Sequence, residues 1–164
     1  MNLKTYLLIV FAVLTFGCKK ETPNNKDSPN KLLVLNIENA ENSIRMKNLN
    51  LDSIYPNLLD PKNITDSEKE VVFNSWISFH DKLSDFIKEE NFEWEVDDSK
   101  VKVYQKIYFT QNGEIEYYLY NIRSEIVSKE KKEEFGNLIK KFSPNVKLDM
   151  VRKGKYAQCG TNVY

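Results

Sequence analysis

The first apolar stretch of the chain runs unbroken from Tyr6 to Phe16, behind the positive charge of Lys4. Its 11 residues are too few to cross the roughly 30 Å hydrocarbon core of a bilayer as a helix. A short apolar run behind a basic start is typical of a secretory signal peptide. The pattern therefore predicts that residues 1–17 form a signal peptide.

A cysteine follows this run directly, and a glycine precedes the cysteine. The stretch "LTFGC", residues 14–18, lacks the Ala-x-Ala pair of an ordinary signal-peptide cleavage site. It resembles the lipobox of bacterial lipoproteins, in which a small residue precedes the cysteine that receives the lipid. The resemblance implies that Cys18 is the acylated mature N-terminus, and two acyl chains suffice for stable membrane anchoring. The alternative is a plain signal peptide or N-terminal anchor with an incidental cysteine.

Polar residues make up the next region, residues 18–30, which is rich in Asn, Pro, Ser and Lys and reaches no apolar residue until Leu32. This composition predicts a flexible tether. The Lys-Lys-Glu that follows Cys18 also resembles the export tags of surface lipoproteins in some bacteria. We therefore expect a protein of the bacterial cell envelope that is anchored by lipid to the outer membrane. The periplasmic side and the cell-surface side of that membrane are both alternatives for its location.

The remaining residues, 31–164, are predicted to form a single α+β domain. A short apolar run from Lys31 to Ile37 favours a strand, and residues 38–62 show an irregular pattern that predicts loops and short turns.

A long amphipathic helix is predicted from about Asp66 to Glu90. Thr65 followed by Glu68 is the signature of a capping box at its start. Apolar residues then recur at steps of three and four, which places them on one helical face. They are Val72, Trp76, Phe79, Leu83, Phe86 and Ile87.

Two strands follow, within residues 99–110 and 114–122, and Gln111-Asn112-Gly113 joins them. Asn-Gly between alternating runs is a strong hairpin signal. A three-residue loop with Gly113 left-handed puts Thr110 opposite Glu114, and it collects the apolar residues on one face. These are Val103, Ile107, Phe109, Ile115, Tyr117 and Leu119. A two-residue loop would set Phe109 beside Glu116 and mix the faces, so we expect the longer loop with a bulge.

The opposite face of this hairpin would carry tyrosines between lysines, with Tyr104 opposite Tyr120. The four tyrosines are Tyr104, Tyr108, Tyr118 and Tyr120. Such a face has two interpretations. It is a plain strand surface, exposed or covered by residues 31–62, or it is a partner-binding surface, since tyrosine offers a large contact area with few torsions.

A second helix is predicted from Lys129 to Phe142, with Ser128 as its N-terminal cap. Two short strands, residues 146–151 and 155–164, should complete the chain around a turn at Lys153-Gly154. The predicted fold class is therefore α+β, with a small antiparallel sheet and two helices packed on one face.

This order of elements is similar to the C-terminal domain of TonB-like proteins. The segments that carry the resemblance are "KIYFTQNGEIEYYLYNI", "FGNLIKKFSP" and "GKYAQCGTNVY", within residues 75–164. The resemblance implies an α+β domain with a sheet edge that binds partner segments by strand addition. TonB itself works with a transmembrane anchor and a Pro-rich spacer, neither of which the sequence indicates, so energy transduction is not carried over.

Composition excludes two classes of function. The chain has 24 Lys+Arg and 24 Asp+Glu, so it lacks the basic field on which non-specific nucleic-acid binding depends. One histidine and two cysteines are too few for a histidine-based metal site or a disulfide framework. We therefore expect no nucleic-acid partner, no metal and no cofactor.

Enzyme chemistry has one candidate, Cys159, in "YAQCGTNVY". The segment faintly resembles the nucleophile segment of papain-type proteases, but these place their histidine base downstream, whereas His80 lies upstream in a predicted helix. We interpret His80 as a helix-surface or boundary residue and Cys159 as a small buried or edge-strand residue. The expected function is a non-enzymatic, lipid-anchored module that binds an envelope protein or peptide. The alternative is an envelope hydrolase or thiol enzyme that uses Cys159.

Overall fold

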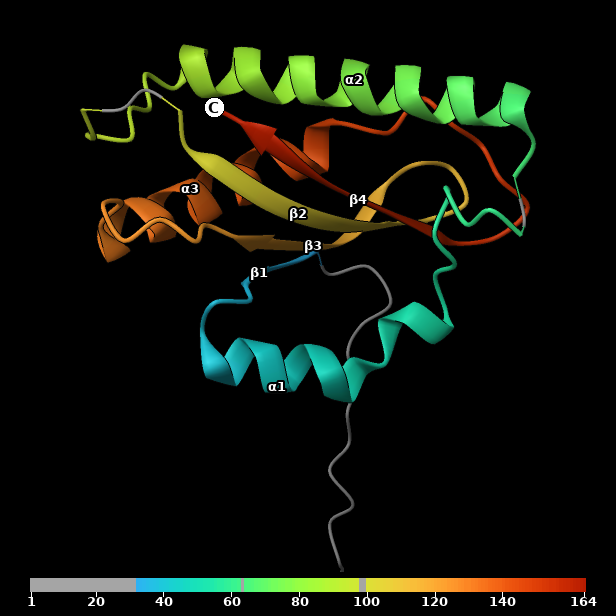
Figure 1. Ribbon diagram of the computed structural model, residues 1–164, viewed down its shortest axis with the longest axis horizontal. Coiled ribbons are helices and arrows are strands. Elements are labelled where there is room, and N and C mark those ends of the chain that lie inside the picture. Colours follow the sequence, from blue (N-terminus) through green and yellow to red (C-terminus); the bar gives the residue numbers. More distant parts are fainter. Residues whose placement is uncertain (1–31, 63, 98–99) are drawn as a thin grey trace, which may run out of the picture.

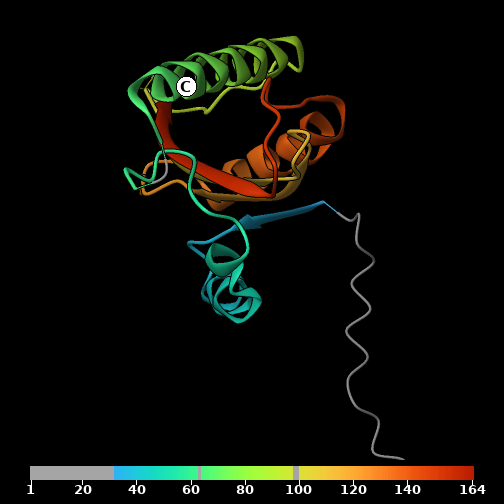
Figure 2. The same cartoon turned by 90° about the vertical axis from the view of Figure 1, so that its right-hand side faces the viewer.

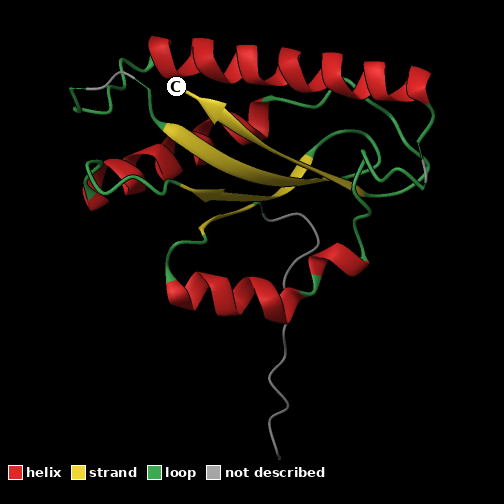
Figure 3. Cartoon of the chain, in the orientation of Figure 1, coloured by secondary structure: helices red, strands yellow, loops and turns green. Residues whose placement is uncertain are grey.

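The computed structural model describes residues 32–62, 64–97 and 100–164. Figure 1 and Figure 2 show three layers, with a sheet between α2 and α3 on one face and α1 on the other. The predicted α+β class is confirmed, and so is the placement of two helices on one face (Figure 3). The predictions for the signal peptide, for Cys18 and for the tether lie outside the described residues.

Four strands form the sheet in the order β1-β3-β2-β4. Their bounds are Leu33–Asn36 for β1, Lys102–Phe109 for β2, Ile115–Asn121 for β3 and Tyr156–Val163 for β4. β2 pairs antiparallel with both β3 and β4, whereas β1 pairs parallel with β3. The sheet is therefore antiparallel except at β1, which a long crossover through two helices separates from β2.

The predicted strand at residues 146–151 is wrong. Within this described segment only Lys147 forms a bridge, to Glu114, and β4 pairs with β2 instead. Leu148 and Met150 are both buried in the main core. Their spacing of two residues therefore reflects anchoring of a connecting segment rather than a strand.

The two long helices begin where the sequence predicts. In α2 (Asp66–Glu89) the Thr65 hydroxyl accepts a bond from the Glu68 N–H at 3.4 Å, and the Glu68 carboxylate accepts one from the Thr65 N–H at 2.9 Å. In α3 (Lys129–Phe142) the Ser128 hydroxyl accepts a bond from the Lys131 N–H at 3.2 Å. Each cap satisfies backbone donors that a helix start leaves free.

Between these helices and the sheet lies the main core. Its most deeply buried side chains include Val72, Phe79, Leu83, Val103, Ile107, Phe109, Tyr118, Ile122, Phe135 and Ile139. The Phe79 ring packs edge-on against Phe109 and Phe142, with centroids 6.1 and 5.6 Å away. Burial of this apolar area is the dominant favourable term for folding.

The second face carries a helix that the sequence analysis missed. Residues 38–62 were predicted as loops and turns, but α1 spans Ala40–Leu49 and a short 3-10 helix, η1, spans Leu51–Ser53. α1 is described from end to end and buries none of its side chains, so its apolar periodicity is weak. A small core nevertheless forms on this face, from Leu35, Leu51, Tyr55, Tyr108, Leu119 and Ala157.

The predicted hairpin turn is confirmed. Gly113 has a φ of 82°, its N–H donates to the Thr110 carbonyl at 3.1 Å, and the Thr110 N–H donates to Glu114 at 2.8 Å. Phe109 lies opposite Ile115, as the three-residue loop requires. The next pair is Tyr108 with Tyr117, so a bulge leaves Glu116 without an opposite residue.

Candidate functional site

The four tyrosines proposed for partner binding do not share a face, so the predicted face is wrong. Beyond the bulge, Ile107 lies opposite Tyr118, and Tyr104 lies opposite Asn121 rather than Tyr120. A shift by one residue turns every later side chain to the other face of the sheet. Tyr118 and Tyr120 therefore belong to the main core, whereas Tyr108 belongs to the small core.

Three of these tyrosines are buried and bonded within the domain. The Tyr108 hydroxyl donates to Asp52 Oδ1 at 2.8 Å, and the Tyr120 hydroxyl donates to the Lys132 carbonyl at 2.9 Å. The Tyr118 hydroxyl donates to Gln105 Oε1. Residues of the 31–62 segment thus cover Tyr108, and only Tyr104, 36% exposed, remains at the surface.

Charged side chains hold the layer that contains α1 and η1. Asp52 pairs with Lys106 at 2.7 Å and accepts the Tyr108 hydroxyl. Partial burial raises the pKa of Asp52, but the hydrogen bonds from Lys106 and Tyr108 and the charge of Lys106 outweigh it, so the pKa lies below its ordinary value. The Tyr55 hydroxyl bonds to Glu116 at 2.7 Å, which gives the residue at the bulge a structural role.

Cys159 lies on β4, an edge strand of the sheet, and is a free thiol. The Asn57 amide nitrogen lies 3.7 Å from its sulfur, and the Tyr104 hydroxyl is within hydrogen-bond reach. Its neighbour along β4, Ala157, belongs to the small core, so by alternation the thiol points to the face that carries α1. The prediction of an edge-strand cysteine is confirmed.

His80 is buried on the opposite face, under α2, so its assignment to the helix surface or boundary is wrong. Its Nδ1 lies 2.9 Å from the hydroxyl of Tyr164, a residue 84 positions away along the chain. Burial lowers the pKa of His80 to about 4, so the ring is neutral at pH 7. The sheet separates His80 from Cys159, and the two cannot act as base and nucleophile of one site.

One stretch of β4 presents backbone groups to solvent. Ala157 exchanges hydrogen bonds with residues 56–58 at 2.8 and 2.9 Å, on the side of β4 away from β2. Backbone groups of alternate residues point to the same side of a strand, so those of Cys159, Thr161 and Val163 also point away from β2. No strand of the described chain pairs with them. Among the described residues, the one donor to the Cys159 carbonyl is the Gln158 side-chain amide, at 3.3 Å.

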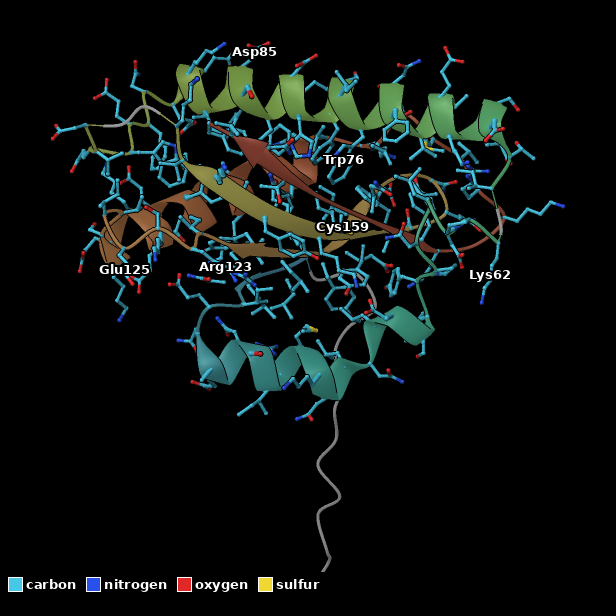
Figure 4. The ribbon with its side chains drawn as sticks, in the orientation of Figure 1. Lys62, Trp76, Asp85, Arg123, Glu125 and Cys159 are labelled. Atoms are coloured by element: carbon cyan, nitrogen blue, oxygen red, sulfur yellow. The ribbon has the colours of Figure 1, made fainter. Side chains whose placement is uncertain are left out.

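An apolar strip of α2 borders this free edge. Trp76 lies over β4, close enough that a Cβ at Gly160 would be 3.0 Å from its indole nitrogen. Figure 4 shows Trp76 between α2 and the sheet, above Cys159 on β4. Phe73 and Ile77, beside Trp76 on α2, are more than half exposed. We call this edge with its strip the β4 edge site: Cys159, Thr161 and Val163 with Phe73 and Ile77.

The β4 edge site has two parts, a strand edge from β4 and two apolar residues from α2, and a different feature of the fold positions each part. β4 lies at the sheet edge because no described strand pairs with it on the side away from β2. Phe73 and Ile77 are four residues apart and share a helical flank, whereas the core stripe of α2 lies on the adjacent face. The apolar periodicity of the sequence indicated only that core stripe and did not single out Phe73 or Ile77. Exposed apolar residues one position beside the stripe were the signal that could have indicated the site.

Among the described residues, no group of three His, Cys, Asp or Glu side chains could hold a metal ion. No helix among the described residues has both the length and the hydropathy to span a bilayer. Comparison with known proteins gave no match to a protein-family model, to a curated protein or to a solved structure.

Proposed function

We propose that this protein is a non-enzymatic binding module of the bacterial cell envelope, held at the outer membrane by lipid on Cys18. Its domain binds an extended segment of a protein or peptide partner, which adds as a strand to β4. The observation that carries this proposal is the row of outward backbone groups at Cys159, Thr161 and Val163 beside exposed apolar residues of α2.

Strand addition suits both halves of the site. An added strand satisfies the free N–H and C=O groups, and its alternate side chains give specificity. At roughly 3.3 Å per residue, a segment of about five residues covers Cys159 to Val163. Side chains on one face of that segment would meet Phe73 and Ile77, so the partner should carry apolar residues at every second position.

The resemblance to TonB-like C-terminal domains is in keeping with this mode of binding and stays a prediction. The enzyme alternative has less support from the geometry. A cysteine nucleophile needs an adjacent base, and the polar groups near the sulfur are the amide of Asn57 and the hydroxyl of Tyr104.

A pair of substitutions at Cys159 tests strand addition and thiol chemistry together. Cys159→Pro removes one outward N–H without removing a bond to β2, and edge strands tolerate proline at such a position. Cys159→Ala is the matched control, because it removes the thiol and keeps the N–H. We expect the proline variant to lose partners that are captured from the native envelope, and the alanine variant to keep them.

Other outcomes of the same comparison are equally informative. Equal capture by both variants would contradict binding at the β4 edge site. Loss with Cys159→Ala would instead favour the thiol enzyme. If Cys159→Pro has a lower melting temperature than the alanine variant, Thr161→Pro and Thr161→Val provide a second pair on the same edge.

The membrane anchor has its own test. Replacement of Cys18 by Ser removes the proposed lipid acceptor while the apolar run of residues 6–16 stays intact. We expect the parent to partition into the detergent phase with membranes and the variant to lose this behaviour. Unchanged partitioning would rule out lipidation at Cys18.

A further inference from the structure

A hollow of about 530 Å³ opens at one end of the sheet, on the face that carries α1. Its volume lies within the range of small-molecule binding sites. The ends of β2 and β3 supply its centre, with Tyr104 of β2 directly opposite Asn121 of β3. Tyr104 is thus the predicted partner-binding tyrosine that lines this hollow.

The charges around this hollow are of one sign. Lys100, Lys102 and Arg123 line it, and no acidic side chain is among its described lining residues. None of these cations forms an ion pair with a described residue. The chain as a whole is neutral, with 24 basic and 24 acidic side chains, so this is a local concentration of positive charge.

Lys102 and Arg123 both line the hollow. Each lies two residues beyond Tyr104 and Asn121, the last pair of β2 with β3. Two like charges in one hollow repel each other. Figure 4 shows Arg123 on the side of the sheet that carries α1. An anion between the two side chains would remove their repulsion and gain charge-assisted hydrogen bonds.

Apolar and uncharged polar groups complete the lining. Ile126 is 67% exposed and contributes to the wall, together with the ring of Tyr104. The Oδ1 atom of Asn121 is buried and has no hydrogen-bond partner among the described residues. Because this oxygen is an acceptor, it does not bind the anionic group, and its desolvation cost is relieved only by a hydroxyl or N–H donor elsewhere on a ligand.

We infer that this hollow binds a small amphipathic anion, in which a phosphate or carboxylate group is attached to an apolar body. The anionic group lies between Lys102 and Arg123, with Lys100 adding charge, and the apolar body covers Ile126 and Tyr104. The hollow shares Thr161 with the β4 edge site, but Lys102 and Arg123, which bind the anionic group, do not belong to that edge.

The test uses the full-length protein in phosphatidylcholine nanodiscs and titration calorimetry at low salt. Hexyl phosphate is the probe, and inorganic phosphate and hexanol are its two halves. We expect hexyl phosphate to bind at least tenfold more tightly than either half. The double variant Lys102→Gln/Arg123→Gln should weaken hexyl phosphate binding at least tenfold. The control Lys153→Gln removes an exposed cation outside the hollow and should leave the affinity unchanged.

Two results would overturn the inference. One is equal affinity in the parent and the double variant when both have the same melting temperature. The other is binding of inorganic phosphate as tight as that of hexyl phosphate, since the apolar wall would then contribute nothing. Lys100→Gln provides a second variant if the double variant is unstable. Nanodiscs that contain phosphatidylglycerol identify the natural source of the anion. If the anionic lipid competes with hexyl phosphate, the ligand is a lipid headgroup; if it does not compete, the ligand is a soluble amphiphile.

Discussion

On the face of the sheet under α2 and α3, strand side chains such as Ile107 and Phe109 are fully buried against helices that bury apolar stripes of their own. On the other face, α1 buries no side chain, and the largest side chains of the small core are the rings of Tyr55 and Tyr108. Both of these rings end in hydroxyls that bond to carboxylates, Glu116 and Asp52, at 2.7 and 2.8 Å.

The contrast concerns which interactions stabilise each layer. Apolar burial is independent of pH and loses several kcal/mol when a large side chain is truncated. Hydrogen bonds to ionised partners contribute about 1.5–3 kcal/mol each, and less where the partner is solvated, as Asp52 is with 64% of its side chain exposed. We therefore expect the two faces to respond to different perturbations.

Truncation in the main core should have the largest effect. Phe79 is 1% exposed and contacts the ring of Phe109 in the sheet and the ring of Phe142 at the end of α3. Phe79→Ala should lower the free energy of unfolding by about 3–5 kcal/mol, measured by urea denaturation. The matched change on the other face, Ile44→Ala on α1, should stay within about 0.5 kcal/mol. Equal losses of unfolding free energy for the two variants would contradict the difference between the two faces of the sheet.

Acid should weaken the α2 face first, through His80. Its pKa of about 4 in the folded protein lies below the ordinary 6.5. Between these two pH values the unfolded chain binds a proton at His80 that the folded chain does not bind. Stability is therefore complete above pH 6.5 and falls as the pH is lowered to about 4, by on the order of 3 kcal/mol. His80→Gln should abolish this part of the pH dependence. A parent and variant with parallel pH profiles would show that the ring is solvated.

The hairpin turn, on which the assignment of residues to faces depends, comes next. A side chain at Gly113 would have a positive φ and would collide with the Leu148 carbonyl oxygen. Gly113→Val should cost on the order of 1–3 kcal/mol, measured as a lower melting temperature. Gly154→Val is the control, because a Cβ there meets nothing within 4 Å. An unchanged melting temperature for Gly113→Val would sink the turn and the register derived from it.

The same contrast explains how far the sequence could be read. Helices α2 and α3 and the Gln111–Gly113 turn follow from local signals: caps, apolar periodicity and a glycine that needs positive φ. α1 has no buried stripe to detect, and its partly buried Met46 and Leu49 pack against a small core whose Tyr108 and Leu119 come from distant strands. Local patterns therefore predict the helices that bury their own face and miss the one that does not.

The candidate sites were harder to predict because they depend on the bulge. Hydrophobic matching favoured Tyr117 and Leu119 on the main face, yet the structure places Tyr118 and Tyr120 there. Both hydroxyls are bonded in this arrangement: Gln105 of β2 accepts the Tyr118 hydroxyl, and the Lys132 carbonyl of α3 accepts that of Tyr120. Glu116 meanwhile bonds to Tyr55 and Lys155 on the other face. The alternation of side chains along the two strands does not predict these contacts.

The smallest predicted effect belongs to Asp52, and it should appear in a separate pH range. Hydrogen bonds from Lys106 and Tyr108, with the charge of Lys106, outweigh partial burial and hold the pKa of Asp52 below the ordinary 3.8. A carboxylate with a lowered pKa stabilises the fold fully above pH 3.8, and this contribution is lost as the pH falls through the folded-state pKa. Asp52→Asn should therefore be less stable than the parent at pH 6, and the difference should shrink below about pH 4.

Glu68, whose pKa is lowered to about 2 by its bonds to Thr65 and Arg152, titrates in the same range, so the stability of Asp52→Asn is compared with that of the parent at each pH. Because His80 acts between pH 6.5 and 4, denaturation of the two variants across pH 2–8 separates the two faces of the sheet. A difference for Asp52→Asn that stays constant down to pH 2 would mean that its ion pair with Lys106 does not hold the α1 layer.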